Sequence, residues 1–194
     1  MPVDVVSYSD EWPVQFATVV AELRRALREV PLVAIEHVGS TAVPGLVAKP
    51  ILDIDIVVRR QHVGPAIAAL GAAGYLHRGD LGVTDREAMA SPDDQPARNV
   101  YICVDATVRL RNHLAVRDIL RRRYDLRDKY GAVKLQLASD PDMDIVSYIA
   151  KKSSILQDVL AESDLSAEEK ALILALNTGG GQSQVYDQPH DSPR

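Results

Sequence analysis

The stretch from Glu36 to Val58 constrains the fold most, because it joins two apolar runs through a tight turn and a loop containing proline and glycine. The second run carries two carboxylates, Asp53 and Asp55, that alternate with leucine and isoleucine. Successive side chains of a strand alternate between its faces, so both carboxylates are expected on the same face. Like charges one pleat apart repel each other, and this strand therefore requires a compensating positive charge.

A divalent cation is one source of that charge. Hard cations such as Mg²⁺ bind one or two carboxylates and leave their other positions to water and phosphate. The turn Gly39-Ser40 precedes the strand: the glycine allows close backbone approach to a ligand, and the serine adds a hydroxyl and an N–H. These residues predict a Mg²⁺ site on Asp53 and Asp55 beside a turn that receives phosphate. The alternative is a pair of strands whose Asp-x-Asp face is simply solvated.

Composition narrows the classes of function. With 194 residues, 46% apolar and 25% charged, the chain has the size and balance of one globular domain. The net charge of −5 (22 basic minus 27 acidic residues) argues against a nucleic-acid binder that relies on nonspecific phosphate attraction. A single cysteine, Cys103, excludes an intrachain disulfide and a cysteine-based zinc cluster.

Targeting signals and membrane spans are not evident in the sequence. No run approaches the ~18 apolar residues that a membrane span needs. The first twelve residues lack the basic start and apolar block of a signal peptide. We therefore expect a cytoplasmic protein with no membrane or nucleic-acid partner, while its oligomeric state stays open.

Periodicity and punctuation predict the order of elements. A first helix is expected to begin at an Asp10 N-cap, to end near Glu29 and to place Trp12 in the core. A last short helix is capped by Ser166, with Glu169 at the capping-box position. Between and around them we expect strands at 3–8, 32–38, 81–90 and 99–108, and helices at 61–73, from 110 onward, at 124–139 and at 143–161. Residues 177–194 are polar and rich in glycine and proline, which predicts a disordered tail.

Further candidate residues lie outside the central stretch. Lys49 lies in the loop before Asp53, where it is expected either to meet a phosphate or to pair with the aspartates. Asp105 shares a predicted strand face with Asn99, which makes it either a third carboxylate beside the pair or a solvent-facing strand end. Arg86 lies on the predicted strand 81–90, as another candidate for substrate binding.

The predicted helices carry the remaining candidates. His113 and Arg117 are four residues apart and share a helix face. Arg117 offers a planar fork for phosphate or carboxylate, or else ties the helix to the aspartates of the sheet. Lys134 and Lys152 each end a Tyr-x-x-x-Lys spacing, and both are also explained as exposed lysines.

A Gly-Ser turn followed by a strand with Asp-x-Asp is typical of the nucleotidyltransferase superfamily. The longer string GSTAVPGLVAKPILDIDI resembles the core motif of the GrpB-like family, a nucleotidyltransferase-related group sometimes fused to dephospho-CoA kinase. The resemblance covers roughly residues 5–160. Many members carry His-x-His where this chain has Tyr101-Ile102-Cys103, and Asn99-x-Tyr-x-Cys followed by HLAVRDILR resembles a second form of the family. That departure argues against a histidine-assisted chemistry on this strand.

The resemblance implies an α+β, nucleotidyltransferase-like fold: a mixed sheet of about five strands flanked by helices, with a C-terminal helical bundle closing one side of the cleft. We expect one domain over residues 1–176, with its sheet core to about 108 and its helical part over 110–176. In the site so implied, Asp53 and Asp55 hold the metal and Asp105 deprotonates the acceptor or holds a second metal. A larger set of residues is expected to contact phosphate or substrate: Gly39, Ser40, Thr41, Lys49, Arg86, His113, Arg117, Lys134 and Lys152.

Three functions follow from these expectations. The first is a Mg²⁺-dependent transfer of a nucleotidyl or phosphoryl group from a nucleoside triphosphate to a small acceptor. The second is a non-catalytic module that binds a nucleotide or a precursor of CoA, which rests on analogy of fold. The third is a metal-dependent enzyme outside nucleotide chemistry that grips a small anionic substrate.

Overall fold

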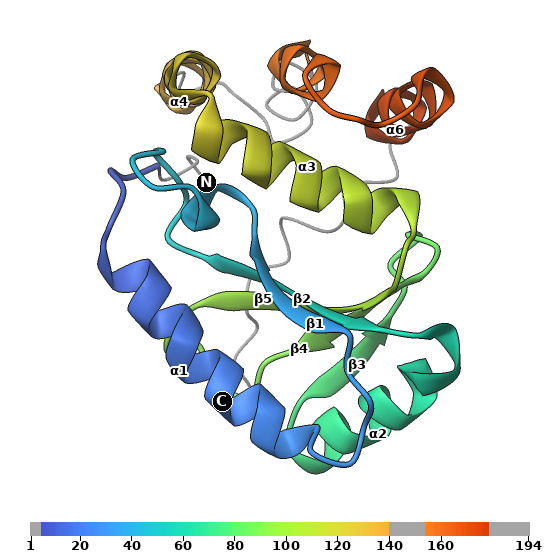
Figure 1. Ribbon diagram of the computed structural model, residues 1–194. Coiled ribbons are helices and arrows are strands. Elements are labelled where there is room, and N and C mark those ends of the chain that lie inside the picture. Colours follow the sequence, from blue (N-terminus) through green and yellow to red (C-terminus); the bar gives the residue numbers. More distant parts are fainter. Residues whose placement is uncertain (1–4, 140–153, 179–194) are drawn as a thin grey trace.

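The computed structural model describes residues 5–139 and 154–178, which form a five-stranded mixed sheet with helices on both faces (Figure 1). The strands follow the spatial order β1 (Ala34–Val38), β2 (Leu52–Val58), β5 (Arg98–Val104), β4 (Arg86–Ala90) and β3 (Leu76–Gly79). The central pair β2 and β5 is parallel, and the other neighbours are antiparallel. The predicted α+β class with a mixed sheet of about five strands is confirmed.

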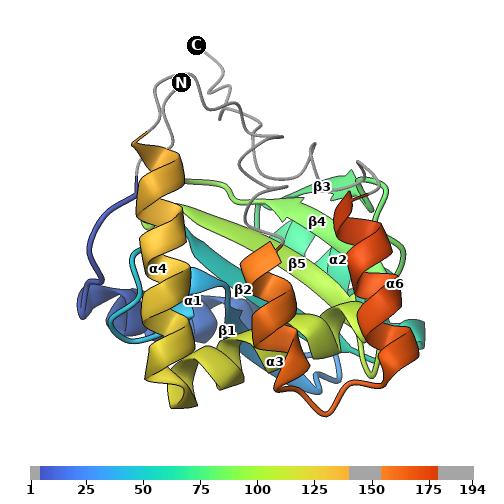
Figure 2. The same ribbon diagram turned by 90° about the horizontal axis from the view of Figure 1, so that it is seen from above.

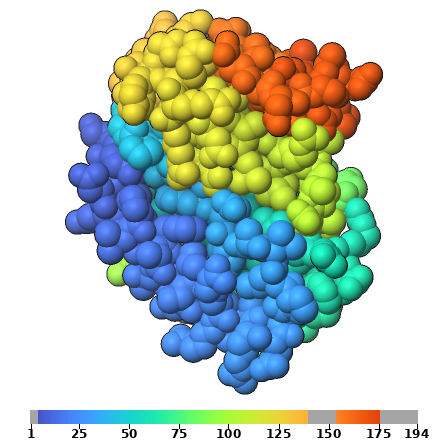
Figure 3. Space-filling model, in the orientation of Figure 1, coloured from blue at the N-terminus to red at the C-terminus, as the bar shows by residue number. Residues whose placement is uncertain are grey.

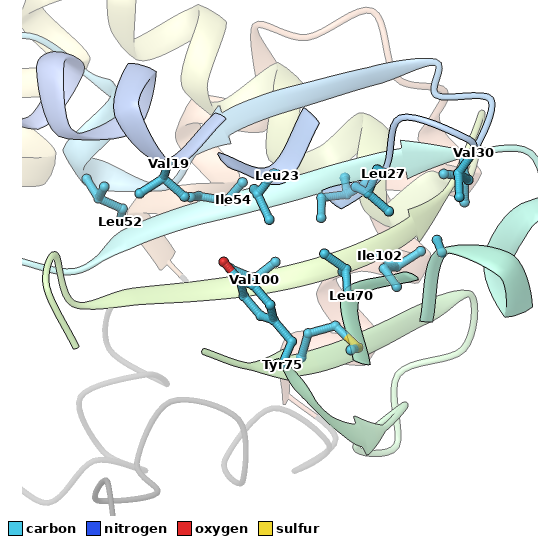
Figure 4. Close-up of a cluster of buried hydrophobic side chains, with 14 of the residues drawn as sticks. Val19, Leu23, Leu27, Val30, Leu52, Ile54, Leu70, Tyr75, Val100 and Ile102 are labelled. Atoms are coloured by element: carbon cyan, nitrogen blue, oxygen red, sulfur yellow. The ribbon is translucent and has the colours of Figure 1, made fainter. Parts of the chain in front are cut away.

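One face of the sheet is covered by α1 (Glu11–Ala26) and α2 (Val63–Ala72), the second of which follows the short helix η2 (Arg60–His62). Figure 4 shows the core between them, where side chains of α1 meet those of the two central strands. Leu52, Ile54 and Ile56 of β2 point into this core and are at most 1% exposed. Burying each such side chain is worth about 1.5–3 kcal/mol. The alternation of residues in β2 thus fixes which face receives α1.

The opposite face of the sheet is covered by α3 (Val108–Arg122), which packs Leu110 on Val57, Tyr101 and Cys103. Above α3 lie α4 (Tyr124–Ala138), the helix at 154–161 and α6 (Ala167–Thr178), side by side in Figures 1 and 2. In Figure 3 these helices occupy one end of the molecule, and α1 lies toward the other. The result is a sheet held between two helical layers, with a second helical layer on one side.

Several predicted element boundaries need correction. The strand expected at 3–8 is reduced, within the described residues, to one bridge between Val6 and Ala48. The strand expected from residue 81 begins only at Arg86, because Leu81 and Asp85 have positive φ angles that belong to turns. The strand expected to reach 108 ends at Val104.

Other boundary predictions can be compared at single residues. Asp10 stands at the start of α1 but makes no side-chain cap; Ser9 Oγ instead accepts a hydrogen bond from the Glu11 N–H at 3.2 Å. The capping box is confirmed: Ser166 Oγ accepts from the Glu169 N–H at 3.2 Å, and Glu169 Oε2 accepts from the Ser166 N–H at 2.8 Å. Trp12 is a core residue, as predicted.

Some predictions lie outside the described residues: Lys152, most of the helix at 143–161, and the tail beyond the end of α6 at Thr178. Within the two described stretches, every helix is too short or too polar to span a lipid bilayer.

Candidate active site at the face of β2 covered by α3

Asp53 and Asp55 lie on the face of β2 that α3 covers, opposite the isoleucines that enter the α1 core. Strand register places Asp55 between Glu36 of β1 and Tyr101 of β5. It places Asp53 one row further along, beside Asn99 of β5. Backbone pairing alone therefore gathers polar side chains from three strands into one patch under α3.

Asp55 is fully buried, and α3 supplies its main contact. His113 Nδ1 lies 2.7 Å from Asp55 Oδ2. Burial lowers the pKa of His113, but the charge and hydrogen bond of Asp55 outweigh burial, so this pKa is raised. Burial and the Asp55 charge also raise the pKa of the neighbouring Cys103 thiol. Among the described residues, no N–H or O–H donor reaches Asp55 Oδ1.

Asp53 is half-buried and is held by its neighbours on both sides. Asn99 donates from Nδ2 to Asp53 Oδ1 at 2.9 Å. On the other side stands Gly39, with φ +71° and ψ −169°, a conformation essentially restricted to glycine. A Cβ built on Gly39 would lie 2.2 Å from Asp53 Oδ2. The glycine at this turn therefore makes room for the Asp53 carboxylate.

The turn after Gly39 forms the short helix η1 (Ser40–Ala42), and its two hydroxyls have different partners. The Ser40 side chain lies beside the phenol of Tyr130 on α4, and the pKa of that phenol is raised chiefly by burial. Thr41 is 1% exposed and was predicted to contact substrate. Its Oγ1 lies 3.0 Å from His37 Nε2 and donates to the Ile51 carbonyl at 3.3 Å, so this hydroxyl is used inside the protein.

His37, the partner of Thr41, stacks on Phe16 of α1 with ring centroids 4.6 Å apart. Burial, together with the positive charges of Arg121 and Arg117, lowers the pKa of His37 to about 4. This histidine is therefore neutral near pH 7.

Four cationic side chains of α3 and α4 hold the end of β1 and the segment between β1 and β2 through their backbone carbonyls. We call these contacts the carbonyl ladder. They are Arg117 to His37 O at 3.1 Å, Arg121 to Ala42 O at 2.9 Å, Arg127 to Pro44 O at 3.1 Å, and Lys134 to Val47 O at 2.5 Å. Hydrogen bonds from charged donors are each worth roughly 1.5–3 kcal/mol when shielded from water. The helical layer thus fixes the path of the loop that carries Gly39 and Ser40.

The ladder changes the roles expected for two residues. Arg117 was predicted either to bind a substrate anion or to tie its helix to the sheet, and it also donates to Glu36 Oε2 at 2.6 Å and Asp118 Oδ1 at 2.7 Å. Lys134, a predicted substrate contact, is 4% exposed under the loop and 5.5 Å from the centroid of the Tyr130 ring. Both side chains therefore contact protein groups at the positions where substrate contact was expected.

Asp105 needs a further correction. It is exposed in the turn after β5, and its N–H donates to Val58 O at 2.9 Å. Tyr101, not Asp105, is the register partner of Asp55, and four strand residues separate the two by roughly 13 Å. Asp105 is therefore not a third carboxylate beside the pair. Lys49 remains a half-buried residue of the loop before β2.

Sequence reasoning missed some members of this patch. Arg121 is not among the predicted site residues, yet it donates to Ala42 O at 2.9 Å. The Tyr-x-x-x-Lys spacing pointed to α4 but drew attention to the lysine, whereas Tyr130 is the residue that meets Ser40. The sequence places Asn99 on a strand face and in the Asn-x-Tyr-x-Cys resemblance, but its contact with Asp53 follows from the parallel pairing of β2 with β5.

The carboxylates of this patch are candidate ligands for a metal ion. Within the described residues, no three His, Cys, Asp or Glu side chains form a cluster able to hold a metal ion. Mg²⁺ does not require one, since one or two carboxylates with phosphate and water are a common ligand set. Asp53 and Asp55, with a buried Oδ1 that no N–H or O–H donor reaches, fit that limited requirement.

Comparisons with known proteins show the family of this chain. The family model described as GrpB protein matches residues 2–162. A UPF0157 protein of Halalkalibacterium halodurans is 31% identical over 84% of this chain and 83% of its own. The UPF0157 protein YqkA of Bacillus subtilis is 26% identical over 97% of this chain. The dephospho-CoA kinase of Mycolicibacterium paratuberculosis is 31% identical over 81% of this chain. The chain spans about half of these last two relatives, 53% and 45%.

Solved structures show the same relationship. The crystal structure of the conserved protein GrpB from Enterococcus faecalis has a TM-score of 0.70 and 31% identity, covering 82% of this chain and 98% of that one. The Cid1 poly(U) polymerase, solved as a mutant bound to MgATP, has a TM-score of 0.55 at 11% identity over 84% of this chain and 54% of that one, a likeness of fold alone. The fold is nucleotidyltransferase-like, and the chain belongs to the GrpB family.

Proposed function

We propose that this protein binds a nucleoside triphosphate with Mg²⁺ and transfers a nucleotidyl or phosphoryl group to a small acceptor. The observation that carries the proposal is the carboxylate pair on β2, with a buried Asp55 Oδ1 that no N–H or O–H donor of the described residues reaches, next to the Gly39-Ser40 turn. The nucleotidyltransferase-like fold supports the proposal.

The residues present suit this reaction in specific ways. Asp53 and Asp55 would hold Mg²⁺, which neutralises charge on the phosphates when bound. Ser40 and the backbone of the turn would receive the terminal phosphates, and the carbonyl ladder keeps that turn in place. An oxygen of the acceptor forms a bond to phosphorus and loses its proton, while the bond from that phosphorus to the leaving group breaks. The leaving group is pyrophosphate in nucleotidyl transfer and the nucleoside diphosphate in phosphoryl transfer.

One observation favours a second candidate, a binding module without turnover. His113 already contacts Asp55 Oδ2, and Asn99 already donates to Asp53, so the carboxylate charges are partly compensated by the protein itself. Part of the matched dephospho-CoA kinase is similar to this chain, which makes nucleotides and CoA precursors the ligands to test.

Calorimetry with Mg²⁺ and nonhydrolysable analogues of the four nucleoside triphosphates tests the first proposal. We expect the wild type to bind at least one analogue, and Asp53→Asn and Asp55→Asn to weaken binding at least about tenfold. Asp105→Asn is the matched control, an exposed carboxylate roughly 13 Å along the strand from the register of Asp55, and should bind as the wild type does. If no triphosphate binds, or if the two substitutions on β2 leave binding unchanged, the proposal is wrong.

Thermal-shift screening with nucleotides and CoA precursors separates the two candidates. A ligand that raises the melting temperature but yields no product with any acceptor tested indicates the binding module. Formation of product that requires Mg²⁺ and Asp55 indicates the transferase.

A further inference from the structure

Arg86 is a buried cation, and two of its guanidinium nitrogens lack a hydrogen-bond partner among the described residues. It is the first residue of β4, pairs with Cys103 of β5 and stacks over the Tyr101 ring, with Cζ 4.4 Å from the ring centroid. Its exposed fraction is 4%, and neither Nε nor Nη2 has a hydrogen-bond partner among the described residues. Guanidinium N–H groups buried without acceptors are costly, so this position calls for an explanation other than packing.

Another buried arginine of the same sheet shows the contrast. Arg98 is also 4% exposed and lies in register with Leu52, on the opposite face of the sheet. Its two terminal nitrogens donate to Asp93 at 2.8 and 3.0 Å, and Nη1 also donates to the Pro96 carbonyl at 2.9 Å. Arg98 leaves only its Nε without a partner, whereas Arg86 leaves both Nε and Nη2 without one, and among the described residues a carboxylate pairs with Arg98 but not with Arg86.

The position of Arg86 relative to the carboxylates indicates what would complete it. Arg86 pairs with Cys103 of β5, and Cys103 pairs with Val57 of β2. Along β2, Asp55 therefore lies between Val57, which is level with Arg86, and Asp53, which lies beside Gly39. The rows of Asp53 and Val57 are four residues, or roughly 13 Å, apart. Between Arg86 and Asp55, both described, no ion pair forms. Two guanidinium nitrogens without an acceptor and a carboxylate oxygen that no N–H or O–H donor reaches therefore lie on the same face among the described residues.

We propose that Arg86 binds an anionic group, phosphate or carboxylate, of the acceptor molecule. This inference rests on the proposed function, because it assigns the Gly39-Ser40 side of Asp55 to the triphosphate and the Arg86 side to the acceptor. The planar fork of arginine matches two oxygens of a phosphate or carboxylate, and Tyr101 holds the plane of that fork. The substrate class is then a small acid whose anionic group lies on the far side of Asp55 from the turn.

The test uses the full chain in EDTA, at constant ionic strength, with orthophosphate and malonate as separate probes. Thermal shift and calorimetry should show saturable binding of one or both anions to the wild type, and the stronger probe distinguishes phosphate from carboxylate. Arg86→Met should weaken that binding at least about tenfold, and Arg86→Lys should weaken it less, because charge is kept and the fork is lost.

Stability measurements separate binding from structure. Because Nε and Nη2 of Arg86 have no hydrogen-bond partner among the described residues, Arg86→Met should leave the melting temperature unchanged or raise it. Arg98→Met should lower the melting temperature by removing an ion pair, and should leave the anion response intact. The inference is overturned if the wild type shows no saturable response, or if Arg86→Met responds as the wild type does. Should Arg86→Met fail to fold, the Arg86→Lys affinity decides. The assay contains neither metal nor nucleotide, so its failure and failure of triphosphate binding are separate results.

Discussion

Gly39→Ala is the substitution whose cost follows most directly from the structure. The backbone at Gly39 has φ +71° and ψ −169°, where a residue with a Cβ is strained by about 1–3 kcal/mol. The added methyl would lie 2.2 Å from Asp53 Oδ2, so the carboxylate must rotate away. That rotation breaks the charge-assisted hydrogen bond from Asn99, worth roughly 1.5–3 kcal/mol when buried and less here because Asp53 is half-buried.

Together these terms predict a loss of about 3 kcal/mol in the free energy of unfolding, or roughly 6–12 °C in melting temperature for a chain of this size. Urea denaturation measures the first quantity and calorimetry the second. Gly71→Ala is the matched control: Gly71 lies in α2 with open space around it, so alanine there should stabilise by about 0.5–1 kcal/mol. If Gly39→Ala were as stable as the wild type, Asp53 would not be lodged against this turn, and the site geometry would be wrong.

Two further predictions concern the neighbourhood of the turn. Lys134→Met removes one contact of the carbonyl ladder and leaves Val47 O without the Lys134 donor. Urea denaturation should then show a loss of about 1–3 kcal/mol in the free energy of unfolding. The control Lys129→Met breaks an exposed pair with Asp158 and should lose less than about 1 kcal/mol. The pKa of His37 is lowered to about 4 in the folded protein. In unfolded chains this histidine is protonated below about pH 6.5, whereas in the folded protein it stays neutral until near pH 4. The free energy of unfolding should therefore fall by roughly 3 kcal/mol from about pH 6.5 to about pH 4. A His37→Gln variant should lack this fall, and the same dependence on pH in that variant would contradict the role of His37.

The sequence predicts well where local rules decide. Alternation in β2 separated the carboxylates from the core isoleucines, and the spacing of Ser166 and Glu169 located a helix start to the residue. The end of β5 was harder, because Ala106 adopts a φ of +59° that alanine does not signal, and Asp105 was carried past the real end of the strand.

The partners of charged side chains were the least predictable part. Arg121 and its acceptor Ala42 O are 79 residues apart in sequence, and a basic run on a helix gives no local sign that one member reaches a distant carbonyl. The same holds for Arg86, whose surroundings depend on three strands meeting in one register. Residue types near the site were visible in the sequence, whereas their pairings required the fold.

The carbonyl ladder has a consequence for how this segment tolerates change. Every amino acid possesses a backbone carbonyl, so side-chain replacements at 42, 44 and 47 keep the acceptors of Arg121, Arg127 and Lys134, whereas a residue inserted or deleted between β1 and position 42 shifts all three. For these three contacts the length of the loop therefore matters more than the side chains at 42, 44 and 47, and residue identity matters in the helices that supply the donors.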